Sequence, residues 1–411
     1  MIKLSQNFAP PFKLVAPFFI IGVTFYLLSS LFTFVINIDL LNFHNSEILA
    51  YVHMLLLGFI MMIIFGAMAQ LIPVTLEVGH FSIEFYYIIY PLLLIGTVLM
   101  FYGFSISPQF ISFGGIFVFI SMIIYLVELF LTIKKVEKFT NITKSLIVSN
   151  LFLLIGIIFG IIMALTYAGV FEIDVQKLLK AHVFSVVFGY IVITIMALSL
   201  ILLPMFGLSH NFSLKPINIS VVILTVAIIT NIIFSIFDIS ILIYISYLLI
   251  IIALIIYFYQ IYLIYKTRAR KENDIYVKAL YFSFTSFLLS ITLALIYFIT
   301  NYEGCIYSSV WLFINGFITY IIIAHLYKIV PFLVWFEKFA PLVGKQKVPM
   351  LVDMIPIKSS SFQFIFGLIG VTISTLGLIF LQDDIFKAGI SFITISAIFL
   401  LKNLIFMIRF K

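Results

Sequence analysis

The chain has 411 residues, of which 64% are hydrophobic and only 9% are charged. Soluble domains carry about 25% charged residues, so this composition excludes a soluble enzyme or binding domain and indicates an integral membrane protein. The net charge of +7 comes from loops predicted to share one side of the membrane. It is therefore a topology signal and not a nucleic-acid-binding surface.

Twelve segments are long and apolar enough to cross a bilayer, which takes about 20 residues in a helix. Because lipid offers the backbone no hydrogen-bond partner, these segments are predicted to be helices. The predicted fold class is all-α, a polytopic membrane protein with a single integral membrane domain over residues 1–411. The predicted spans are 14–36, 49–74, 85–104, 110–133, 146–168, 179–203, 217–237, 240–265, 277–299, 307–334, 363–381 and 387–408.

Lysine and arginine gather in alternate connections, above all after the fourth, eighth and tenth spans, whereas the opposite connections hold mainly aspartate and glutamate. Basic loops stay in the cytoplasm, so we expect an N-in, C-in protein whose first span is not cleaved. The expected location is the cell (inner) membrane, as a multi-pass protein. Its expected partner is the lipid bilayer, with no nucleic acid.

A pattern of histidine, glycine and proline recurs in the second and sixth spans. His53 and His182 open these spans, and Gly58 and Gly189 follow them. Each span closes on a Leu-Ile-Pro or Leu-Leu-Pro segment, and the tenth span shares this closing proline at Pro331. Spans four apart with common features predict a pseudo-three-fold arrangement of four-helix units. The predicted units are about 14–133, 146–265 and 277–408.

An imidazole inside a spanning helix is costly unless it is hydrogen-bonded or binds a ligand. His53 and His182 are predicted to lie at similar depth, and imidazole is a common metal ligand. Both are therefore candidates for binding haem or a metal ion, with Gly58 and Gly189 allowing close approach of the ligand. The alternative is two unrelated, hydrogen-bonded histidines, with glycines that serve only helix packing.

Three further polar residues are candidates for a proton or polar path: His325, Lys328 and Glu128. His325 is only six residues before Pro331. At a rise of 1.5 Å per residue it lies about 20 Å deeper than the two opening histidines, which excludes it from their site. The alternatives are that Lys328 extends to the interface and that Glu128 pairs with Lys134.

The remaining histidines and the single cysteine are expected to be unremarkable. His80 and His210, just past the second and sixth spans, are predicted to be solvated loop residues, and His44 to lie in an outer loop. Cys305 is also assigned to an outer loop, where one cysteine permits no disulfide within the chain. The common motifs of soluble hydrolases, metalloproteases and nucleotide-binding enzymes are absent from the sequence.

The twelve spans, with His53 opening the second and His182 in the sixth, resemble the haem-copper oxidase subunit I superfamily. The segment HMLLLGF at 53–59 is also similar to the second span of the NnrS family of haem- and copper-containing membrane proteins. The resemblance implies that His53 is an axial ligand of haem b. It further implies that His182 is the second haem ligand or a copper ligand.

The chain departs from the oxidase pattern at the catalytic centre. The seventh span lacks the two adjacent histidines of that family, and the tenth opens IYSSVWLFINGF without paired histidines. Val186 stands four residues after His182, where the family has a tyrosine, and the next tyrosine is Tyr190. The resemblance thus implies a degenerate relative with at most one haem or a loosely held metal.

The function predicted from this resemblance is electron relay, haem or copper handling, or a role beside a respiratory oxidase or other membrane redox subunits. We do not expect a complete terminal oxidase or nitric oxide reductase, and whether the protein is an enzyme stays open. Two alternatives also stay open. They are a secondary transporter of a small solute and an assembly scaffold without a cofactor.

Overall fold

The computed structural model describes residues 10–38, 45–170 and 172–411. Twelve helices in these ranges are long and apolar enough to cross a membrane, which confirms the predicted all-α, polytopic fold. No end of a predicted span differs from the observed helix by more than six residues. His44, predicted to lie in an outer loop, falls outside the described residues.

The chain divides into two compact units, residues 71–271 (unit 1) and 10–70 with 272–411 (unit 2). Unit 1 holds α4 (Phe85–Ser105), α5 (Gln109–Ile133), α6 (Asn141–Tyr167), α7 (Val175–Val183), η3 (Phe184–Val192), α8 (Ile193–Gly207), α9 (Lys215–Ile236) and α10 (Ser240–Lys266). Unit 2 holds α1 (Phe12–Phe32), α2 (Ser46–His53), η2 (Met54–Met61), most of α3 (Met62–Leu76), α11 (Ile275–Thr300), α12 (Glu303–Trp311), η4 (Leu312–Ile318), α13 (Thr319–Lys338), η5 (Ala340–Leu342), α14 (Ile357–Ile379) and α15 (Asp383–Ile408).

The second, sixth and tenth spans share an architecture that the sequence did not predict. Each begins as an α-helix, widens into a π-helical segment (η2, η3 or η4) and returns to an α-helix. These three spans are also the longest of the twelve. π-Helical segments are rare and frequently mark functional sites. Their recurrence every fourth span agrees with the predicted repeat.

The π-helical segments and the prolines that follow them keep a constant spacing. A glycine within each segment stands fifteen residues before a proline, as Gly58–Pro73, Gly189–Pro204 and Gly316–Pro331. The spans were expected to close at these prolines, and this is wrong. The helices continue to Leu76, Gly207 and Lys338, because a membrane helix tolerates an internal proline when its neighbours satisfy the freed backbone groups.

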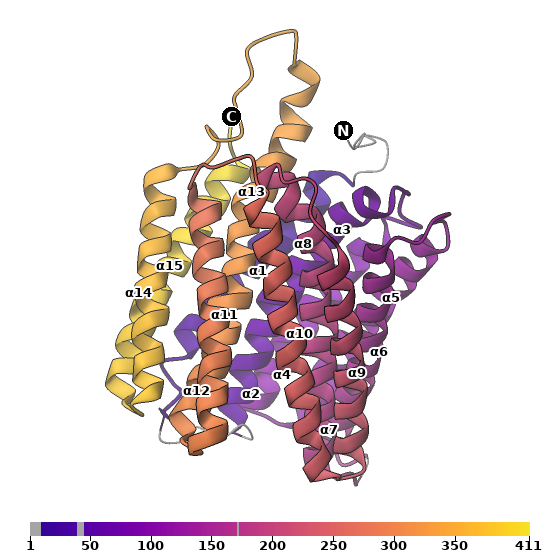
Figure 1. The fold of residues 1–411 in the computed structure, drawn as a ribbon, viewed down its shortest axis with the longest axis vertical. Coiled ribbons are helices and arrows are strands. Elements are labelled where there is room, and N and C mark those ends of the chain that lie inside the picture. The colour runs from indigo at the N-terminus through magenta and orange to yellow at the C-terminus, as the bar shows by residue number, and fades with distance from the viewer. Residues whose placement is uncertain (1–9, 39–44, 171) are drawn as a thin grey trace. The chain divides into compact units, whose positions relative to one another are not determined.

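In the first and third predicted four-helix repeats (14–133 and 277–408), the third span packs against the fourth as a close antiparallel hairpin. Figure 1 shows this for α14 and α15. Gly96 of α4 meets Gly114 of α5, and Gly370 of α14 meets Gly389 of α15. A Cβ added at any of these four positions would lie within 3.0 Å of the opposite backbone. Glycine is therefore required for the close approach of these helices.

Seven residues beyond those glycines, a serine of the fourth span binds the third span. The Ser121 hydroxyl donates to the Ile89 carbonyl (2.9 Å), and the Ser396 hydroxyl donates to the Gln363 carbonyl (2.8 Å). In α9 and α10 the direction reverses, because Ser220 donates to the carbonyl of Ala253 (2.6 Å). The same contact thus recurs in all three predicted units.

Seven residues after Ser121, Ala253 and Ser396, the fourth span of each predicted four-helix repeat carries a larger polar side chain that is buried. We call this place the fourth-span polar position. It is Glu128 in α5, Gln260 in α10 and Asn403 in α15, with exposed fractions of 0%, 0% and 1%. Only the first of the three is ionisable.

Both described ends of the chain lie at the same end of unit 2. The Phe12 backbone N–H donates to a Glu337 carboxylate oxygen (2.7 Å), and the Lys338 ammonium donates to the Phe410 carbonyl (2.9 Å). This agrees with an even number of spans. The assignment of that end to the cytoplasm stays a prediction.

Candidate functional site

The two opening histidines occupy equivalent places in their spans. His53 is the eighth residue of Ser46–Leu76, and His182 is the eighth residue of Val175–Gly207. Each stands at the junction of the first α-helix with the π-helical segment. His53 belongs to unit 2 and His182 to unit 1, so each is described within its own unit.

Both rings are oriented by a backbone carbonyl. His53 Nδ1 lies 2.8 Å from the Leu49 carbonyl oxygen, and His182 Nδ1 lies 2.8 Å from the Gly156 carbonyl oxygen. Because a carbonyl can only accept, the hydrogen is on Nδ1 in each ring. This assigns the lone pair of the neutral imidazole to Nε2, the arrangement usual in histidines that bind metals.

The His182 ring packs against α6 at a position that the sequence did not single out. A Cβ added at Gly160 would lie 3.0 Å from His182 Cε1. Gly160 therefore makes room for the imidazole beside the carbonyl of Gly156, which orients it. The signal in the sequence was the spacing of these two glycines, one helical turn apart on the preceding span.

Gly58 and Gly189 lie against aromatic rings of the preceding span. A Cβ at Gly58 would meet the Phe25 ring, and a Cβ at Gly189 would meet the Phe152 ring, both within 2.6 Å. Their visible role is helix packing, the alternative raised from the sequence. A part in cofactor binding stays a prediction and has no support from these contacts.

The segment around His53 is tied to the tenth span by polar and aromatic contacts within unit 2. The Tyr51 hydroxyl donates to Asn315 Oδ1 (3.1 Å), and the Tyr51 ring stacks on Trp311 at a centroid distance of 6.2 Å. The indole N–H of Trp311 in turn donates to the Ser374 hydroxyl (2.9 Å). These contacts fix the helix that carries His53.

His325 and Lys328 lie on α13 and share one neighbour, Tyr276. The His325 ring meets Tyr276 edge-on at 5.3 Å, and the Lys328 ammonium lies 5.4 Å from the centre of the same ring. Lys328 also pairs with Asp274 at 2.6 Å, with exposed fractions of 14% and 27%. His325 Nδ1 bonds the Ile321 carbonyl at 2.7 Å. Lys328 is thus held in a salt bridge and does not simply extend to the interface.

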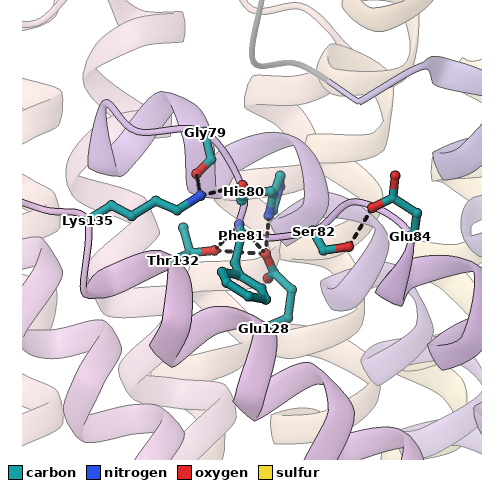
Figure 2. A network of polar contacts seen from close by, with 8 residues as sticks. All are labelled: Gly79, His80, Phe81, Ser82, Glu84, Glu128, Thr132 and Lys135. Carbon is teal, nitrogen blue, oxygen red and sulfur yellow. Dashed lines mark hydrogen bonds and ion pairs between the residues drawn. The ribbon is translucent and has the colours of Figure 1, made fainter.

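Glu128 lies in unit 1 and pairs with a residue that the sequence placed in solvent. Its Oε1 is 2.8 Å from His80 Nδ1, and the two side chains are 0% and 3% exposed. Figure 2 shows the two side chains directed at each other. The expectations of a solvated His80 and of a Glu128–Lys134 pair are both wrong. His210, in contrast, is exposed as predicted.

The segment 77–84 folds back onto the end of α5, and this buries His80. The Phe81 N–H donates to Thr132 Oγ1 (2.8 Å) and to Glu128 Oε1 (3.2 Å). The Lys135 ammonium donates to the Gly79 and His80 carbonyls at 3.3 and 2.8 Å (Figure 2). Hydrophobic spacing reports the spans but not how a connection docks, so this contact was not predicted.

The two oxygens of the Glu128 carboxylate have very different surroundings. Oε1 accepts from His80 Nδ1 (2.8 Å), from the Phe81 N–H (3.2 Å) and from the Thr132 hydroxyl (2.8 Å). Oε2 is buried and accepts no hydrogen bond of normal geometry among the described residues, and the Tyr86 hydroxyl is close enough to the carboxylate to interact with it. An unpaired buried carboxylate oxygen is costly, and one in a native structure needs an explanation.

Within the described ranges, no group of three His, Cys, Asp or Glu side chains could hold a metal ion. Cys305 was expected in an outer loop, but it is a buried residue of α12.

Neither the family models nor the curated proteins compared with this chain gave a match. The resemblance to the haem-copper oxidase superfamily and to the NnrS family therefore stays a prediction.

Proposed function

We propose that this protein is a redox or metal-handling protein of the inner membrane, in which His53 is an axial ligand of haem b and His182 is a ligand of haem or of a copper ion. The observation that carries the proposal is the common state of the two rings. Each gives its Nδ1 hydrogen to a backbone carbonyl at 2.8 Å, which puts the lone pair of the neutral imidazole on Nε2, the nitrogen that would bind iron or copper. Both also stand at the start of a π-helical segment.

The residues present fit an axial or copper ligand better than they fit a complete catalytic centre. A haem or copper ion supplies reversible one-electron chemistry when bound. The chain contributes the orientation of the imidazoles, through the carbonyls of Leu49 and Gly156 and the space at Gly160. The role proposed is electron relay, or haem or copper handling, beside respiratory oxidase or other membrane redox subunits.

An optical spectrum of the purified full-length protein, oxidised in air and then reduced with dithionite, tests the proposal together with metal analysis. We expect a reduced-state haem band or bound copper that is lost in His53→Ala and in His182→Ala. His325→Ala is the matched control, because His325 has the same Nδ1–carbonyl bond but is the twenty-third residue of its span. It should retain the spectrum.

A second variant moves one proposed ligand without removing it. In Gly160→Ala the new Cβ would lie 3.0 Å from His182 Cε1, so the ring must shift. We expect a displaced band or weaker metal retention, whereas Gly207→Ala, whose Cβ meets its nearest neighbour at an ordinary 3.5 Å, should behave like the wild type. A blank spectrum with blank metal analysis would end the proposal and give priority to transport assays in proteoliposomes.

A further inference from the structure

We propose that His80 and Glu128 form a buried site in unit 1 that binds one proton, and that this proton holds segment 77–84 on the end of α5. The site is independent of the proposed haem or copper ligands. It depends on the surroundings of the carboxyl group, on a comparison with the two matching positions in the chain, and on charge.

The surroundings show that the carboxyl group has room for a proton on one oxygen only. Oε1 already accepts three hydrogen bonds, from His80, Phe81 and Thr132. Oε2 is buried and accepts no hydrogen bond of normal geometry among the described residues, and the Tyr86 hydroxyl is the remaining polar group beside the carboxyl group. A proton added to the carboxyl group would therefore reside on Oε2 and leave the three bonds to Oε1 in place.

The comparison shows that an acid is not needed to build this part of the fold. At the fourth-span polar position, the second and third predicted four-helix repeats have amide side chains, Gln260 and Asn403, which are equally buried. Gln260 Oε1 accepts from the Ile217 N–H (3.3 Å), and Asn403 Nδ2 donates to the Tyr327 hydroxyl (2.9 Å). A neutral amide is thus accepted at this depth, although Gln260 Nε2 and Asn403 Oδ1 have no hydrogen-bond partner among the described residues. The carboxyl group of Glu128 adds one property that the amides lack, which is the ability to gain and lose a proton.

Charge explains why the pair keeps a single proton. With one proton the pair is neutral overall, as an imidazolium with a carboxylate or as a neutral imidazole with a carboxylic acid. Loss of that proton leaves a buried carboxylate without a cation in contact, and gain of a second leaves a buried cation. Either net charge is costly in a site whose two side chains are 3% and 0% exposed.

Among the described residues, the other ionisable groups around the pair do not supply the missing charge. The Tyr86 hydroxyl of α4 is within hydrogen-bonding reach of Glu128, and the Tyr86 ring meets His80 edge-on at 5.3 Å. Tyr125 of α5 and Tyr190 of η3 interact electrostatically with Glu128 or with the other tyrosines. Lys135 is a cation, but its ammonium binds the backbone carbonyls of Gly79 and His80. The proton on the pair is therefore the charge that balances the site.

The consequence is a bell-shaped dependence of segment 77–84 on pH. The segment is held best when the pair carries one proton, and it loosens when a second proton is added or the first is lost. Coupled groups of this kind titrate as a pair and not as separate residues. The Phe81 amide reports the docked state, because its N–H donates to both Thr132 and Glu128.

Hydrogen exchange of the Phe81 amide in the full-length protein in lipid nanodiscs, corrected for intrinsic exchange and measured across pH, tests the proposal. Two variants keep a hydrogen-bonding side chain but remove one titrating group each. Glu128→Gln copies the residue of α10 and should lose the alkaline limb of the bell, because no carboxylate can form. His80→Asn keeps a donor to Oε1 and should lose the acid limb, because no imidazolium can form.

His210→Asn is the control, since His210 is exposed and should leave both limbs unchanged. A profile that is flat in the wild type, or that keeps both limbs in Glu128→Gln and in His80→Asn, would overturn the proposal. If Glu128→Gln does not fold, Glu128→Asp serves in its place. It keeps the carboxyl group and should displace the alkaline limb without removing it.

Discussion

In unit 1, two connections dock on the end of a fourth-span helix, and we call these two places the first and the second corner. They share the docking arrangement but differ in whether an ionisable side chain takes part. In the first, segment 77–84 after α3 docks on the end of α5 through His80 and Glu128. In the second, the connection after α8 docks on the end of α10, where the fourth-span polar position is Gln260. Each connection contains a histidine next to a phenylalanine or a serine, His80 before Phe81 and His210 after Ser209, yet only the His80 side chain is buried.

The second corner shows that neutral hydrogen bonds are enough to close the connection. The Ser209 hydroxyl lies 2.7 Å from the Ile264 carbonyl and 2.6 Å from Thr267 Oγ1. The Arg270 N–H donates to the Gly207 carbonyl (3.1 Å). The ionisable pair of the first corner is therefore an addition to a shared scaffold, and substitutions at matching positions can separate the two contributions.

The largest expected difference is between the two polar positions themselves. Glu128→Met removes the acceptor of the His80 imidazole and of the Thr132 hydroxyl, while the Phe81 N–H keeps its bond to Thr132, so we expect a loss of about 3–5 kcal/mol in the free energy of unfolding. Gln260→Met removes one acceptor, that of the Ile217 N–H, and should cost about 1–3 kcal/mol. Reversible unfolding in mixed detergent micelles measures both. Equal losses would show that the carboxyl group acts as the amide does.

The two histidines should differ by less. His80→Ala removes a 2.8 Å hydrogen bond to a carboxylate, so we expect a loss of about 1.5–3 kcal/mol, the usual contribution of a hydrogen bond to a charged group. His210 is exposed, so His210→Ala should stay within about 0.5 kcal/mol of the wild type. The same unfolding assay applies. A comparable loss from His210→Ala would mean that both corners depend on their histidines.

The sequence predicted the fold well because span length and hydropathy are set by the bilayer. It also indicated the four-span period from a few shared residues, whereas the ligand roles of His53 and His182 stay a prediction. It did not predict the π-helical segments, because the widening of a helix leaves hydropathy almost unchanged. The prolines misled for a related reason, since Pro331 stands seven residues before the end of α13 and not at it.

The first corner was missed for a different physical reason. Whether His80 is solvated or buried depends on how segment 77–84 folds back, and no periodicity encodes that. Still, the chain contains a signal that could have found it. Glu128 stands fourteen residues after Gly114, and Asn403 stands fourteen residues after Gly389. An alignment of the two hairpins on these glycines places Glu128 and Asn403 at the same position, and so shows an acid where the other hairpin has an amide.

The smallest expected effect concerns the lysine that covers the first corner. Lys135 binds two carbonyls of segment 77–84 at 3.3 and 2.8 Å and lies 5.6 Å from the centre of the Phe81 ring, but it is exposed. Solvent screens such contacts, so Lys135→Ala should change the free energy of unfolding by no more than about 0.5 kcal/mol. We expect it instead to speed local exchange of the Phe81 amide. Lys134→Ala, at the exposed neighbouring position, should not, and equal acceleration in both would show that general surface charge, and not the bonds to Gly79 and His80, holds the segment in place.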